Sequence, residues 1–178
     1  MFSDPLLFIC RMVCLAFFMS LPGTVQADEI KDVTSTQLRD VLKSYQNKHN
    51  VLLLVHAGWV TPQTENNLRI MKKAWEKAPK DYVVVSLWFD PLKEKAKRRP
   101  LLEALFADIN LPGQHLSFKF PNDQPNDDYE QGLFVAKVIQ EITGLNGFEV
   151  VSNPDCLMIY KDPTKKSTSV ACYGPDPR

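Results

Sequence analysis

Five consecutive apolar residues, Val51–Val55, restrict the fold of this chain more than any other stretch. An uninterrupted apolar run is typical of a strand buried on both faces, as in a parallel sheet. A small-residue turn follows, and Pro62 suits the first turn of a helix, where its missing N–H group costs nothing. Tyr82–Phe89 forms a second apolar run. The sequence therefore predicts a βαβ unit whose first turn lies at the edge where α/β sheets carry their sites.

The first 27 residues match the pattern of a cleaved secretory signal. Arg11 precedes the apolar run Met12–Leu21, and Val25-Gln26-Ala27 resembles a small-x-small cleavage site. A membrane anchor is the alternative, but about 20 apolar residues are needed to span a bilayer and this run is shorter. We therefore expect a signal peptide at 1–27, one domain at 28–178, no stable membrane span after cleavage, and a periplasmic or secreted protein.

The charge composition argues against electrostatic recognition of nucleic acid. The chain has 21 basic and 21 acidic residues and no net charge. The basic run Lys93–Arg99 is either an anion-binding patch or a solvated helix face or loop, and we favour the second interpretation because no aromatic residues interleave it. The carboxylates of 121–128 lack the pattern of a calcium-binding EF-hand loop, so we expect a solvated loop leading into a helix.

Local signals predict three further helices. Thr34 and Gln37 can form a capping box before an apolar stripe. Pro100 is expected to start a short helix. A third helix is expected over Asp128–Thr143, with Gly144 as its C-terminal stop.

Two short extended segments near the C-terminus predict a β-hairpin. Asp155–Tyr160 and Thr168–Tyr173 flank a polar turn. A turn centred on Thr164 would place residues whose numbers sum to 328 opposite each other, and 156 + 172 = 328. In an oxidising compartment, Cys156 and Cys172 are then expected to form a structural disulfide, with two buried free thiols as the alternative.

The turn after the first strand resembles the active-site turn of the thioredoxin family, Trp-Cys-x-Pro-Cys. Here it reads Trp59-Val60-Thr61-Pro62-Gln63, so Val60 and Gln63 occupy the positions of the two cysteines. Pro154, which precedes the hairpin, matches the family's cis-proline. The resemblance implies a thioredoxin-like α/β fold: a central mixed sheet flanked by helices, with a C-terminal β-hairpin. The segment 90–147 is longer than in small thioredoxins, and we expect a helical and loop insertion before the cis-proline strand.

Other thiol-dependent families give the same result at this turn. Thr61-Pro62-Gln63 with Glu65 is similar to a glutathione peroxidase segment, in which Gly58 would replace the reactive cysteine or selenocysteine. A peroxiredoxin alignment on Thr61 would place Thr64 at the peroxidatic position. The sequence contains no cysteine between Cys14 and Cys156, so every alignment of the turn lacks the nucleophile.

The three histidines are too scattered in sequence to suggest a metal site. His56 ends the central strand near the turn, and we expect it to be hydrogen-bonded there rather than to bind a metal. A metal carrier centred on His56 is the least favoured of the functions considered.

These observations predict an exported, redox-inactive, thioredoxin-like protein that binds or scaffolds other proteins of the bacterial envelope, such as secretion or conjugation machinery. We expect no catalytic residue, metal or cofactor. The competing hypothesis is a thiol-dependent oxidoreductase or peroxidase-like enzyme that uses Cys156 or Cys172. The resemblance implies a protein-binding groove formed by the turn and the cis-proline segment: Trp59, Val60, Thr61, Pro62, Gln63, Asn153 and Pro154.

Overall fold

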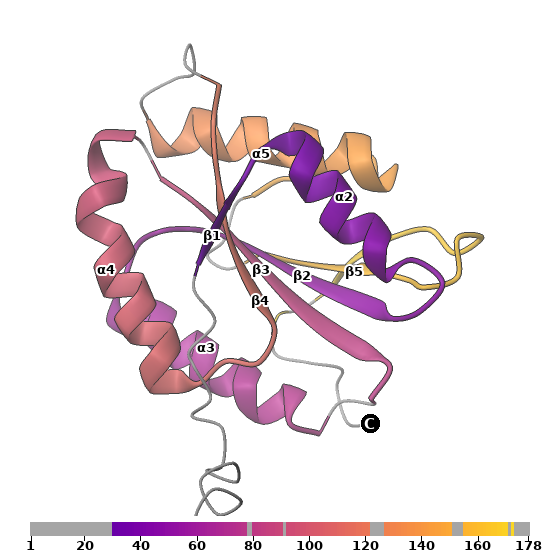
Figure 1. Ribbon diagram of the computed structural model, residues 1–178, viewed down its shortest axis with the longest axis horizontal. Helices are drawn as coiled ribbons and strands as arrows, with labels where there is room; N and C mark the ends of the chain where they lie inside the picture. The colour runs from indigo at the N-terminus through magenta and orange to yellow at the C-terminus, as the bar shows by residue number, and fades with distance from the viewer. Residues whose placement is uncertain are drawn as a thin grey trace, which may run out of the picture.

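A single mixed sheet forms the centre of the molecule (Figure 1). The structure is a computed structural model that describes residues 30–77, 80–90, 92–121, 127–150, 155–170 and 172. Its six strands have the spatial order β1-β4-β3-β2-β5-β6. They are β1 (Lys31–Val33), β2 (Asn50–Ala57), β3 (Tyr82–Phe89), β4 (Gln114–Phe118), β5 (Asp155–Ile159) and β6 (Thr168–Val170).

The strand directions divide the sheet into two parts. Strands β1, β4, β3 and β2 are parallel to their neighbours, while β5 runs antiparallel to β2 and β6 antiparallel to β5. Parallel neighbours are joined by crossover helices, so the carboxyl ends of β2, β3 and β4 meet at one edge. That edge carries the turn identified from the sequence.

Helices α2 (Ser35–Tyr45) and α5 (Asp128–Thr143) cover one face of the sheet. The predicted capping box starts α2: the Thr34 side chain accepts from the Gln37 backbone, and Gln37 reaches back to the Thr34 N–H. Gly144 ends α5 in the left-handed conformation, as predicted. The core of this layer contains alternate residues of β2 (Val51, Leu53 and Val55) beneath both helices.

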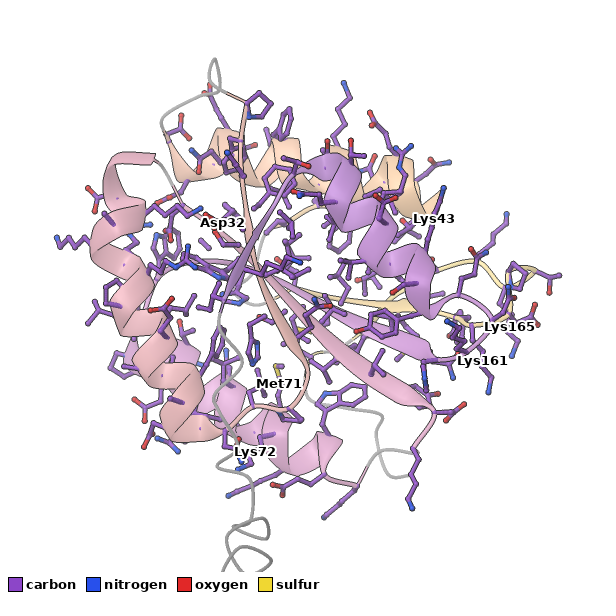
Figure 2. All side chains as sticks on the ribbon, in the orientation of Figure 1. Asp32, Lys43, Met71, Lys72, Lys161 and Lys165 are labelled. Carbon is purple, nitrogen blue, oxygen red and sulfur yellow. A yellow bond between two sulfur atoms is a disulfide. The ribbon has the colours of Figure 1, made fainter. Side chains whose placement is uncertain are left out.

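Helices α3 (Pro62–Trp75) and α4 (Leu92–Ile109) cover the opposite face. Met71 of α3 points toward the sheet, and Figure 2 shows it beneath the strands. The other alternate residues of β2, Leu52 and Leu54, pack against this layer. Both faces of β2 are therefore buried, which explains its uninterrupted apolar sequence.

The predicted fold class is confirmed: a central mixed sheet flanked by helices and ending in an antiparallel hairpin, the thioredoxin-like arrangement. The segment 90–147, predicted as helix and loop, also contributes β4. This strand lies between β1 and β3 in the interior of the sheet. The sequence signal for this strand is weak, because the strand is short and contains the polar residues His115 and Ser117.

Two local predictions are wrong. Pro100 does not start a helix but lies inside α4. In the hairpin, Cys156 pairs with Val170 and Met158 with Thr168, so opposite residues sum to 326 rather than 328. The centre of the turn therefore lies one residue earlier than predicted, and within it Asp162 accepts hydrogen bonds from the backbone N–H groups of Thr164 and Lys165.

Candidate functional site

The turn between β2 and α3 lies at the carboxyl edge of the sheet. Gly58 follows the last residue of β2, and its N–H donates to the Phe89 carbonyl at the end of β3 (3.0 Å). The Thr61 hydroxyl accepts from the Thr64 N–H (3.1 Å) and so caps α3. Pro62 is the first residue of the helix, as the sequence predicts.

Trp59 is the most distinctive side chain of this turn. It is 43% exposed, yet its indole Nε1–H donates to Asp128 Oδ2 at the start of α5 (3.0 Å). Val60, the next residue, is 37% exposed. The turn therefore presents a large apolar side chain to solvent in a fixed orientation.

Arg98 of α4 binds the two carboxylates beneath Trp59. Its Nη1 atom donates to Asp90 Oδ1 (2.7 Å) and to Asp128 Oδ1 (3.3 Å). Hydrogen bonds thus link four side chains in series, from the end of β3 through α4 and α5 to the turn. We call these four residues, Trp59, Asp90, Arg98 and Asp128, the edge network. The edge network fixes Trp59 relative to three other elements.

Asp90 is the buried end of the edge network. Gly58 lies so close that a Cβ atom there would be 1.9 Å from Asp90 Oδ2, so any other residue would force this carboxyl group to shift. Burial raises the pKa of Asp90 to about 6, although the hydrogen bond and positive charge of Arg98 act in the opposite direction.

The edge network was not predicted from the sequence, because its members are separated by up to 69 residues. Two signals were present. Asp90 directly follows an apolar strand, at the edge where parallel sheets carry polar groups, and Arg98 lies about two helical turns later.

The other residues predicted for the protein-binding groove are not all brought together by the described structure. Gln63 points along α3 and donates to Asn67 Oδ1 (3.0 Å). Asn153 and Pro154 lie outside the described residues, so the predicted cis bond stays a prediction. Asp155, the first described residue of β5, lies opposite Val55 of β2.

The two C-terminal cysteines are joined by a disulfide, with Cα atoms 5.2 Å apart. Cys156 lies opposite Leu54, in the core layer beneath α3 and α4, and both cysteines are buried. Cys172 lies two residues beyond Val170, the residue that pairs with Cys156, and both cysteines belong to the same buried cluster.

His56 is fully buried behind the turn. Its Nδ1 atom contacts the Ala57 carbonyl (3.3 Å) and its Nε2 atom contacts the Ser86 hydroxyl (3.0 Å). Because a carbonyl only accepts, Nδ1 carries the proton and Nε2 accepts from Ser86. His56 is therefore hydrogen-bonded at the strand end, as expected. Within the described residues, no group of three His, Cys, Asp or Glu side chains could hold a metal ion.

The basic run is more than a solvated helix face. Besides Arg98, its residues Lys95 and Arg99 pair with Asp32 of β1 (2.7 and 3.1 Å). Asp32 lies close to α4 in Figure 2. The expectation of a solvated segment is therefore wrong for these three residues, which join α4 to the rest of the fold.

Comparison with known proteins gives structural neighbours only. No family model matches the chain, and no curated protein sequence matches it. A Bacteroides vulgatus protein described as a thiol-disulfide oxidoreductase is 22% identical, with a TM-score of 0.40 over 72% of this chain and 65% of that one. A secreted Mycobacterium tuberculosis disulfide oxidoreductase homologous to E. coli DsbE is 12% identical, with a TM-score of 0.40 over 75% and 78%. The chain thus spans less than two thirds of the Bacteroides protein.

No helix of the described residues is both long and apolar enough to cross a membrane.

Proposed function

We propose that this chain is an exported, redox-inactive thioredoxin-like protein that binds another protein at the carboxyl edge of its sheet. The observation that carries this proposal is the half-exposed Trp59 ring, which Asp128 holds through its indole N–H. Tryptophan is strongly enriched among the residues that dominate binding energy at interfaces. A ring that is already oriented loses less conformational entropy when a partner covers it.

Further exposed apolar side chains lie near Trp59, or near Asp128, which binds it, in the sequence. We define the Trp59 surface as Trp59, Val60, Tyr129 and Leu133. Tyr129 is 73% exposed and Leu133 is 46% exposed, and they lie one turn apart at the start of α5, beside the residue that binds Trp59. These four are among only six large apolar side chains exposed within the described residues. Their proximity favours a protein partner with an apolar contact surface.

The turn supports binding without thiol chemistry. A thiol–disulfide enzyme needs an accessible thiolate, and the start of α3, where helix amides would stabilise it, has Val60 and Gln63 instead. Cys156 and Cys172 are bonded to each other and buried. The alternative, an oxidoreductase or peroxidase-like enzyme that uses these cysteines, requires that the bond be reduced and that α3 expose them.

The proposed location is the periplasm or the exterior of the cell. A disulfide between two buried cysteines suits an oxidising compartment, and 1–27 has the pattern of a cleaved leader. The partner is then a component of the bacterial envelope, and secretion or conjugation machinery is one setting. Asn153 and Pro154 belong to the proposed site through the thioredoxin resemblance, as the segment that offers backbone groups to a partner strand.

A photo-crosslinking residue at Val60 tests this proposal in the native envelope. Ile70 on α3, which is 41% exposed, is the matched control position. We expect a discrete crosslinked product from Val60 that Trp59→Ala reduces at least tenfold, and none from Ile70. Equal products from both positions, or an unchanged product in Trp59→Ala, would contradict the Trp59 surface. Thiol-dependent turnover by the unmodified protein would instead favour the enzyme.

A further inference from the structure

Helices α2 and α5 leave two adjoining hollows between them on the sheet face that they share. One has a volume of about 420 Å³ and the other about 310 Å³. Ser35 and Phe134 line both, so the hollows are continuous, and we call them together the α2–α5 groove. The larger hollow is lined by Thr34, Ser35, Phe118, Lys119, Phe120, Pro121 and Phe134. The smaller is lined by Ser35, Thr36, Arg39, Phe134, Lys137, Val138 and Glu141.

The larger hollow is aromatic. The ring centroids of Phe118 and Phe120 lie 4.9 Å apart, and Phe134 lies 5.8 Å from Phe120 and 6.1 Å from Phe118. Phe118 and Phe120 are buried, while Phe134 is partly exposed at the boundary with the smaller hollow. This end offers an apolar ligand a preformed wall of packed rings.

The smaller hollow is basic. Arg39 comes from α2 and Lys137 from α5, so the two cations reach it from facing helices, with Glu141 as the one acidic residue of its lining. Lys119 adds a third cation at the aromatic end. Within the described residues, Arg39, Lys119 and Lys137 form no ion pair, whereas Lys95, Arg98 and Arg99 of α4 are paired. Unpaired cations beside an apolar hollow are suited to a ligand that combines an anionic group with an apolar part.

We propose that the α2–α5 groove binds a small anionic amphiphile, namely a carboxylate with a medium-length alkyl chain. The chain occupies the aromatic hollow, and the carboxylate lies between Arg39 and Lys137. The hollows fall at the lower end of the size range of small-molecule sites, roughly 300–1,000 Å³. This site is independent of the Trp59 surface and of the proposed function.

Decanoate is the probe for this proposal. Calorimetry should give saturable 1:1 binding, and amide resonances of Ser35 and Val138 should shift on titration. Octanoate, two methylenes shorter, should bind roughly tenfold more weakly, because each buried methylene contributes about 0.8 kcal/mol. Decyltrimethylammonium has an alkyl chain of nearly the same length with a positive head group and should not bind.

Substitutions outside the core test whether decanoate binds in the α2–α5 groove. Arg39→Glu should weaken decanoate binding at least tenfold. Lys43→Glu is the matched control, since Lys43 carries the same charge on the same helix and lines neither hollow (Figure 2). Ser35→Phe, which fills the shared part of the groove, should abolish binding while thermal unfolding shows that the fold is retained. Trp59→Ala should leave binding unchanged.

Several results would overturn the proposal. They are absence of saturable binding at millimolar decanoate, equal affinity for the cationic amphiphile, equal effects of Arg39→Glu and Lys43→Glu, or resonance shifts confined to the Trp59 surface. Failure here leaves the protein-binding proposal untouched, because that proposal is tested by crosslinking at Val60.

Discussion

Asp90 connects three elements at the carboxyl edge of the sheet. It directly follows β3, binds Arg98 of α4, and fills the space beneath Gly58. Arg98 extends the connection to Asp128, and Asp128 to Trp59. Asp90 is therefore linked to the exposed ring indirectly, through Arg98 and Asp128.

The fit of Gly58 against Asp90 gives the first prediction. Gly58→Ala should lower the free energy of unfolding by about 1–3 kcal/mol, the usual cost of overpacking a filled site. Urea denaturation measures this loss. In an Asp90→Ala background the same substitution should cost less, since the atom that the new methyl group meets is gone. An equal cost in both backgrounds would show that the strain arises elsewhere.

The burial of His56 gives the second prediction, which concerns pH. Burial lowers the pKa of His56 to about 4, from an ordinary value of 6.5. The unfolded chain therefore binds the proton more readily, and stability falls as the pH falls from about 6.5 to 4. A shift of this size corresponds to about 3 kcal/mol.

Denaturation at several pH values compares the wild type with His56→Gln, whose amide can still bond to Ser86. The variant should lack this part of the acid-dependent loss. The raised pKa of Asp90 acts in the opposite sense: its stabilising contribution is greatest below pH 4 and declines as the pH rises through about 6. Identical pH profiles for the two proteins would show that the pKa of His56 is the same in the folded and unfolded states.

At the scale of elements, local signals predicted α2, β3 and α5 well. A capping box, an apolar run and a C-terminal glycine each act within a few residues. The prediction that Pro100 starts a helix is wrong for α4. The first half of this helix is stabilised by ion pairs of Lys95, Arg98 and Arg99 rather than by an apolar stripe. Those ion pairs connect residues that are 8–67 positions apart in the sequence, so no local sequence pattern predicts them.

The hairpin gives the third prediction. Replacing Cys156 and Cys172 together by serine should lower the free energy of unfolding by about 3 kcal/mol, because the bond closes a segment with a sequence separation of 16. Chemical denaturation under non-reducing conditions measures the change. Wild-type protein treated with a reductant in denaturant and then alkylated provides a second measurement. A loss below about 0.5 kcal/mol would mean that the bond contributes little to the folded state.

At the scale of the whole molecule, helix α5 contributes residues to both proposed sites. The Trp59 surface lies at the carboxyl edge, where β2 and β3 meet the start of α5, and the α2–α5 groove lies over one face. The βαβ unit and the hairpin could be predicted because β2 and β3 are continuous apolar runs. The insertion of β4 between β1 and β3 could not, since strand order depends on pairing between segments more than 80 residues apart.

The last prediction follows from the distribution of cysteines over the whole chain. Two of the four, Cys10 and Cys14, lie in the predicted leader, and the other two form the disulfide. Protein recovered from the envelope should therefore begin at Asp28 and show no free thiol when unfolded without reductant. It should show two thiols after reduction, because cleavage removes Cys10 and Cys14. Mass spectrometry with thiol labelling measures both the start and the count. Four thiols after reduction would show that the leader is retained, whereas two free thiols before reduction would leave Cys156 and Cys172 available for the chemistry that the turn lacks.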